Sequence, residues 1–90
     1  MTVMAERMKA KLTTALAPER LEIIDESHQH YGHGGWREGG ETHFRVKIVS
    51  QAFAGKSRLA RHRLINEAVA AELAERVHAL AIEARAPGED

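Results

Sequence analysis

The sequence predicts an α+β fold in two layers, with a three-stranded mixed sheet and the helices on one of its faces. Three observations predict this fold: an amphipathic helical stripe near the start, two strand-like segments after it, and a long helical segment before a third strand-like one. The helical connection makes the second and third strands parallel. Ninety residues suffice for one core, so we expect a single domain over residues 1–86 and a short flexible tail over 87–90.

The first helix is predicted from four apolar residues that recur at every fourth position, namely Met4, Met8, Leu12 and Leu16. This spacing places their side chains on one face of a helix. Pro18 ends the helix, because proline lacks a backbone N–H and cannot continue the hydrogen-bonding pattern.

Two strands separated by a glycine-rich loop are predicted next. Residues 20–26 show β-branched side chains in partial alternation, and residues 28–40 show no periodicity. Residues 42–49 alternate cleanly. Their apolar face consists of Phe44, Val46 and Ile48, and their outward face carries His43, Arg45 and Lys47. We therefore expect His43 to be exposed.

A long helix is predicted over residues 57–75, with Ser57 at its N-cap, because apolar residues recur there at helical spacing. Residues 77–84 predict the third strand. Pro87 and Gly88 open the tail.

The composition excludes several classes of protein. Thirteen basic and thirteen acidic residues cancel, which argues against a protein held to nucleic acid by bulk charge. The chain has no cysteine, so any metal site must use His, Asp or Glu. The first residues are too charged for a signal peptide or a membrane span, so we expect a cytoplasmic protein with no membrane contact. No catalytic set can be argued from spacing, and we expect no enzymatic activity.

The middle of the chain is basic despite the zero net charge. Between residues 43 and 63 there is no acidic residue, and the basic ones are Arg45, Lys47, Lys56, Arg58, Arg61 and Arg63. With His62, these residues are candidates for binding a partner or nucleic acid. Among them, Arg61, His62 and Arg63 could form a basic docking edge for an acidic partner, a glutathione carboxylate or a phosphate. The alternative for His62 is a partly buried histidine between two solvated arginines.

Two glycine motifs resemble phosphate- or nucleic-acid-binding motifs without matching them fully. "GKS" at residues 55–57 follows a strand and precedes a helix, as in a phosphate-binding P-loop, but Ser50 occupies the position where that motif requires its first glycine. A turn glycine before a capped helix explains these residues. "GHGG" at residues 32–35 has the spacing of a KH clamp, but it would join two strands instead of two helices.

Histidines are the candidate metal ligands. His28, His30 and His33 have a spacing that a loop could fold around a metal ion, although on these residues alone a solvated surface is the better interpretation. His78 lies at the start of the third predicted strand, where a hydrogen-bonded structural histidine is the default.

Taken together, "DES" followed by a loop histidine, "ETHFRVKIVS", "FAGKSRLARHRLINEAVAAEL" and "VHALAI" resemble the BolA family over residues 3–86. The resemblance implies a class II KH-like fold, in agreement with the predicted order of elements. It also implies an adaptor that binds a monothiol glutaredoxin, shares a [2Fe-2S] cluster with it and acts in iron–sulfur trafficking and iron regulation.

The family's ligand positions match His30 and His78, and the longer loop adds His28 and His33 as rivals to His30. Imidazoles can replace thiolates on one iron of such a cluster. A glutaredoxin cysteine and glutathione would supply the sulfur ligands, so the isolated chain, a monomer or weak homodimer, would hold no cluster tightly.

The resemblance also implies an alternative function, because some members bind DNA and regulate transcription in cell morphology and the stress response. The basic stretch from Arg45 to Arg63 would then contact phosphates.

Overall fold

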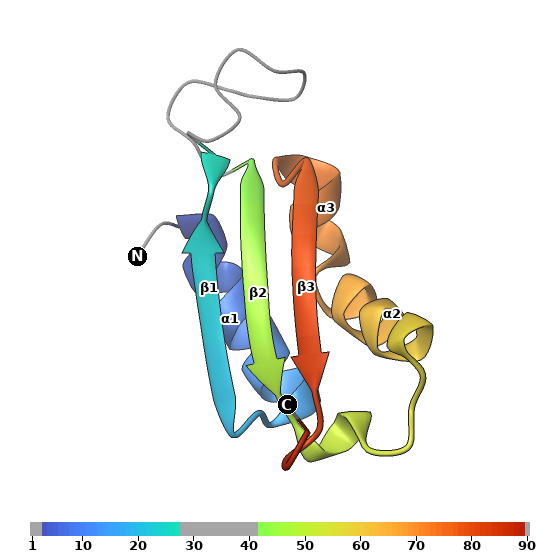
Figure 1. Cartoon of the computed structure of the whole chain (residues 1–90). Helices are drawn as coiled ribbons and strands as arrows, with labels where there is room; N and C mark the ends of the chain where they lie inside the picture. The colour runs from blue at the N-terminus through green and yellow to red at the C-terminus, as the bar shows by residue number, and fades with distance from the viewer. Residues whose placement is uncertain (1–2, 28–41, 90) are drawn as a thin grey trace.

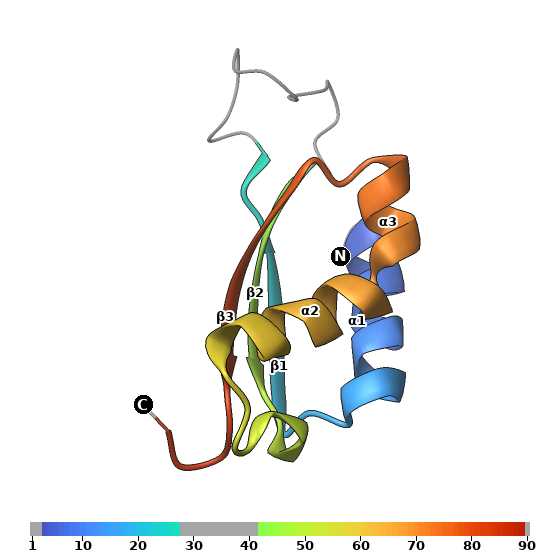
Figure 2. The ribbon, with the colours of Figure 1, turned by 90° about the vertical axis from the view of Figure 1, so that its right-hand side faces the viewer.

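The computed structural model of the chain describes residues 3–27 and 42–89. Its elements follow the predicted order and are α1 (Val3–Leu16), β1 (Arg20–Asp25), β2 (His43–Val49), the 3₁₀ helix η2 (Gln51–Phe53), α2 (Arg58–Ala68), α3 (Ala70–Glu75) and β3 (Ala79–Arg85). The strands form one sheet in the order β1-β2-β3 (Figure 1). The α-helices lie on one face of this sheet, and no helix of the described residues covers its other face (Figure 2). The predicted two-layer fold is confirmed.

The sheet is mixed, as predicted. β1 pairs with β2 in antiparallel orientation, and β2 pairs with β3 in parallel orientation. Val46 in β2 lies opposite Ile23 and Ile82, so the apolar residues of the three strands share one face. This face meets the helices.

The core lies between the helices and the sheet. The apolar stripe of α1 is buried there as predicted, against the alternating apolar residues of β2. Other core side chains come from the connection and the later helices, namely Phe53, Ile65, Val69 and Val77. α1 ends where Ala17 adopts a left-handed backbone conformation, with φ of 43°, immediately before Pro18.

The long helix predicted over residues 57–75 is wrong in one respect, because it is broken at Val69. Val69 has φ of −112° and ψ of 25°, and the chain changes direction there between α2 and α3 (Figure 2). No glycine or proline marks the break, and Val69 is fully buried. Packing of this side chain into the core overrides the local preference for a continuous helix.

The start of the third strand also differs from the prediction. Pairing begins at Ala79 instead of residue 77. The backbone N–H of Val77 donates to the carbonyl of Glu72 at 3.0 Å, so Val77 completes the end of α3. The last carbonyl groups of a helix lack partners within the helix, and the N–H of Val77 bonds to one of them instead of taking part in strand pairing.

The start of α2 confirms the structural interpretation of "GKS". The hydroxyl of Ser57 accepts a hydrogen bond from the N–H of Ala60 at 3.1 Å and caps the helix. Gly55 has φ of 75°, in the region that favours glycine. The turn and the cap together account for these residues.

Candidate functional site

His78 is held at the end of the sheet where β2 begins. Its backbone N–H donates to the carbonyl of Thr42 at 2.6 Å, and the N–H of Ala79 donates to the same carbonyl at 3.1 Å. The residue before it, Val77, is buried in the core, whereas His78 itself is exposed. The backbone is therefore fixed at a point where the imidazole remains accessible.

His43 lies beside His78 and is buried, so the prediction that it is exposed is wrong. Only 5% of His43 is accessible to solvent. The centroids of the two imidazole rings are 5.4 Å apart, with 53° between the ring planes, and Nδ1 of His43 lies 2.8 Å from the hydroxyl of Thr42. Alternation along the strand predicts which face a residue shares with Arg45 and Lys47, but not what covers the end of that face.

Ser27 brings the two ends of segment 28–41 together at the same place. Its hydroxyl oxygen accepts hydrogen bonds from the N–H of Thr42 at 2.9 Å and from the N–H of His43 at 3.1 Å. Ser27 is buried, and its own N–H donates to Oδ1 of Asp25 at 2.8 Å. The residues that flank segment 28–41, Ser27 and Thr42, therefore lie at the end of the sheet that carries His78.

The loop histidines His28, His30 and His33 lie outside the described residues, and their assignment as ligands stays a prediction. Within residues 3–27 and 42–89, no three side chains of His, Cys, Asp or Glu come close enough together to hold a metal ion. What the described residues bring together is the pair of imidazoles, His43 and His78. Further ligands would have to come from the loop or from another molecule.

Replacing Ser27 by alanine is expected to lower the free energy of unfolding by about 1–3 kcal/mol, because two buried N–H groups lose their acceptor. Amide hydrogen exchange at Thr42 and His43 should accelerate in the same variant. Thr13→Ala, which removes an exposed hydroxyl from α1, should change stability by less than about 0.5 kcal/mol. Unchanged exchange at Thr42 and His43 would show that Ser27 does not hold the loop ends.

The predicted basic residues do not form one surface. Arg45 lies on the face of the sheet away from the helices, where its guanidinium contacts Glu26 at 3.0 Å and Glu83 at 3.2 Å. These contacts, led by the hydrogen bond to Glu26, raise the pKa of Arg45. Lys47 is exposed on that same face, and Arg63 is exposed on α2. The remaining residues of the set line a hollow between α2 and β3, namely Lys56, Arg58, Arg61 and His62.

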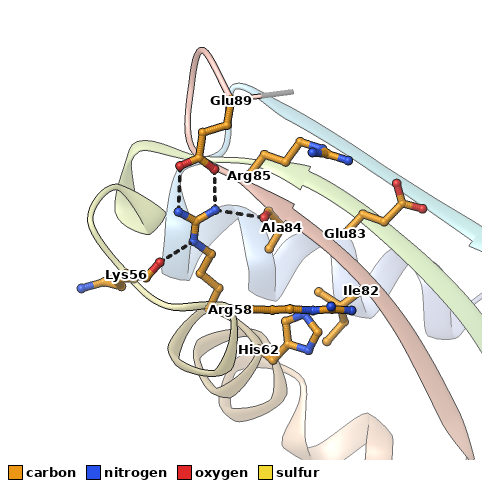
Figure 3. A pocket seen from close by; sticks show the side chains of 9 residues that line it. Lys56, Arg58, His62, Ile82, Glu83, Ala84, Arg85 and Glu89 are labelled. Carbon is orange, nitrogen blue, oxygen red and sulfur yellow. Dashed lines mark hydrogen bonds and ion pairs between the residues drawn. The ribbon is translucent and has the colours of Figure 1, made fainter.

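The side chain of Arg61 binds groups of its own chain and is therefore not free to bind a partner. Its guanidinium donates to the carbonyls of Lys56 at 3.0 Å and Ala84 at 3.2 Å, and it binds both carboxylate oxygens of Glu89 (Figure 3). Only 12% of the Arg61 side chain is exposed. It joins the start of α2, the end of β3 and the C-terminal turn.

Glu89, which was predicted to lie in a flexible tail, is bound on two sides. Besides the contact with Arg61, its carboxylate accepts a hydrogen bond from the N–H of Ala86 at 2.9 Å. These two hydrogen bonds, the one from Arg61 first, lower the pKa of Glu89 to about 2. The sequence contained no local pattern for the contact with Arg61, because the two residues lie 28 positions apart.

The sequence and the fold of this chain are similar to those of known proteins. The model of the family described as "BolA-like protein" matches residues 12–89. The chain is 56% identical over 87 residues to an uncharacterized Sinorhizobium protein from the cobS 5' region, covering 96% of this chain and 94% of that protein. It is 51% identical over 82 residues to mouse BolA-like protein 1, covering 91% of this chain but only 57% of the longer mouse protein.

A solved structure, the BolA domain of SufE1 from Arabidopsis thaliana, superimposes with a TM-score of 0.90 at 44% identity, covering all of this chain and 99% of that domain. In the part of the chain that the structure describes, no helix is both long and apolar enough to cross a membrane. The family model covers most of the chain, and the superposition extends to its whole length. This chain therefore belongs to the family of BolA-like proteins.

Proposed function

We propose that this chain is an adaptor that binds a monothiol glutaredoxin and completes a shared [2Fe-2S] cluster, acting in iron–sulfur trafficking and iron regulation. The observation that carries the proposal is the exposed imidazole of His78, whose backbone is fixed by two hydrogen bonds beside the base of the histidine-containing loop. We propose a binding role, with no catalytic residue. The similarity to a BolA domain that is part of SufE1 supports the same direction.

The residues present fit such a cluster as one half of its ligand set. A [2Fe-2S] cluster requires four protein or thiol ligands, and two histidines can serve one of its irons. Here His78 supplies one imidazole and His30 the second, with His28 and His33 as the rival loop residues. The chain has no cysteine, so the partner cysteine and glutathione would supply the sulfur ligands.

His43 has a positioning role in this proposal. It is buried against His78, and the contact between its Nδ1 and the hydroxyl of Thr42 orients the ring. Neighbouring groups that restrain a ligand histidine raise its effectiveness as a ligand, because less conformational freedom is lost on binding. His43 and Thr42 thus restrict the positions that the His78 ring can adopt.

His78→Ala is expected to change the visible absorption and circular dichroism spectra of the cluster that forms with a monothiol glutaredoxin, iron, sulfide and glutathione. The variant lacks the imidazole that would bind iron, so the iron would have a different set of ligands and the spectra should change. His78→Cys should restore a stable cluster with a different spectrum, because a thiolate also binds iron. Binding of the apo chain to the apo glutaredoxin, followed separately, shows that the alanine variant still docks.

Identical spectra for His78→Ala and wild type would remove His78 from the ligand set. The same measurement on His28→Ala, His30→Ala and His33→Ala identifies the loop ligand, and we expect His30→Ala to have the largest effect. His43→Gln should make the complex lose its cluster more readily, but the spectrum of the cluster that remains should still match that of the wild type, because His78 is unchanged.

The alternative, a DNA-binding regulator, receives less support from the structure. Arg45 and Arg61 already contact carboxylates of their own chain, and the exposed basic residues lie on different faces. Binding to duplex DNA that weakens steeply with rising salt would favour this alternative, because phosphate contacts release counterions.

A further inference from the structure

A hollow of about 480 Å³ lies between the start of α2 and the outer edge of β3. Lys56, Arg58 and His62 line it on the helix side, and Ile82 and Arg85 line it on the strand side (Figure 3). It lies away from the histidine pair, because β3 starts next to His78 and the hollow flanks its second half.

The charges in this hollow do not cancel. Arg61 and Glu89 bind each other, and the carboxylate of Glu83 is paired with Arg45 at 3.2 Å. Lys56, Arg58 and Arg85 have no carboxylate within 4.0 Å among the residues that the structure describes. The three are exposed, so the hollow presents unpaired positive charge to solvent.

The strand side of the hollow is an open sheet edge. Among residues 3–27 and 42–89, β3 has a neighbouring strand on one side only. The carbonyl of Arg85 points toward β2, since it accepts the N–H of Ser50 at 2.9 Å, whereas the carbonyl of Ala84 points outward to Arg61. Backbone groups alternate along a strand, so those of Ile82 also point outward. An extended segment can pair with such an edge.

We propose that this hollow docks an extended acidic segment of a partner protein, which pairs with the edge of β3 at Ile82 and places carboxylates against Lys56, Arg58 and Arg85. The bound carboxylate of Glu89 shows how this region holds such a group, between a guanidinium and a backbone N–H. The proposal goes beyond the proposed function, because docking here requires neither the cluster nor its histidine ligands.

The observations favour a peptide over a phosphate ligand. Lys56 points away from Arg58, and Arg85 extends from the opposite wall (Figure 3). One phosphate therefore could not contact them all, whereas side chains spaced along a peptide could.

The test uses the whole chain labelled with ¹⁵N and a synthetic peptide of about eight alternating Glu and Val residues, the length of an ordinary strand. Its addition should shift the amide signals of Ile82 to Arg85 and of the first turn of α2. A matched peptide with Gln in place of Glu should bind at least about tenfold more weakly, since it lacks the charge.

Lys56→Gln with Arg58→Gln should weaken binding of the acidic peptide by about tenfold. Lys9→Gln with Arg20→Gln removes the same charge from exposed positions on α1 and β1 and should leave the affinity within about twofold. Equal weakening in both double variants, equal affinity for the two peptides, or no binding would overturn the proposal. Inorganic phosphate or duplex DNA that shifts the same signals at lower concentration would also overturn it and assign the hollow to phosphate.

Discussion

Replacing both Arg7 and Lys11 by methionine is expected to lower the free energy of unfolding by about 3–5 kcal/mol, because the pair of changes leaves a buried carboxylate without a counter-charge. That carboxylate belongs to Glu72 on α3, whose side chain is fully buried. Its Oε2 lies 2.8 Å from both Nη2 of Arg7 and Nζ of Lys11 on α1, and Lys11 also donates to Oε1 at 3.0 Å. The two cations connect the short helix α3 to α1.

The third substitution in this series, Glu72→Gln, should recover part of the stability lost in the double variant, because a neutral amide costs less to bury than a charge. Urea-induced unfolding followed by far-UV circular dichroism measures the difference. Glu75→Gln is the matched control, since Glu75 also contacts Arg7, at 2.7 Å, but 55% of its side chain is exposed. It should cost less than about 1 kcal/mol. A control as costly as the double variant would mean that burial of Glu72 is not the cause.

The contribution of Glu72 to the pH dependence of stability should have opposite signs in the wild type and in the double variant. In the wild type, burial acts to raise the pKa of Glu72, but the hydrogen bond from Lys11 and the charges of Lys11 and Arg7 outweigh it, and the pKa is lowered from 4.5. The stabilising contribution is therefore present above about pH 4.5 and is lost as the pH falls through the lowered pKa.

In the double variant neither Lys11 nor Arg7 lowers the pKa of Glu72, so burial, the largest influence, raises this pKa and protonation relieves the penalty as the pH falls. The difference in stability between the two proteins should thus narrow from pH 7 toward pH 4. An equal difference at both pH values would contradict this account of Glu72.

Phe53→Ala is expected to lower the free energy of unfolding by about 3–5 kcal/mol, since it removes a fully buried aromatic ring and leaves a cavity. Phe53 lies in η2, between β2 and α2, and its carbonyl accepts the N–H of Lys56 at 3.0 Å. Ser50, also fully buried, caps this turn by accepting the N–H of Ala52 at 3.1 Å. The ring anchors the connection that carries Lys56 to the hollow beside β3.

Chemical denaturation measures the loss, and Phe53→Leu should cost less because most of the volume is retained. Leu59→Ala is the control: Leu59 is 60% exposed on α2, and its truncation should change stability by less than about 0.5 kcal/mol. Amide exchange at Lys56 should accelerate in Phe53→Ala and not in Leu59→Ala. Similar losses for the two truncations would show that Phe53 is not part of the core.

The face assignments of α1 and β2 could be predicted from the sequence because periodicity is a local property. A helix or strand with a regular apolar pattern has one way to bury it, and the stripe of α1 meets the alternating residues of β2 as expected. The cap at Ser57 was predictable for the same reason, since its acceptor and donor lie three residues apart.

Of the proposed cluster site, the sequence alone indicated His78 and the loop histidines, through motifs that it shares with the family. Their arrangement required the fold. The parallel register places His43 opposite Ala79, and this register brings the ring of His43 beside His78. The residues of β2 and β3 do not by themselves show which of them lie opposite one another, because the register is set when the two distant segments pair. His43 could therefore not be recognised from the sequence as the neighbour of His78.

The sequence by itself determined the order of the elements, the buried faces of α1 and β2, and membership of the family through its motifs. The tertiary structure alone decided that Arg45 and Arg61 contact carboxylates of their own chain, that Val69 divides the long helix, and that unpaired positive charge gathers beside β3. The physical reason is range. Backbone geometry and apolar spacing act between near neighbours, whereas ion pairs and core packing join residues that only the completed fold brings together.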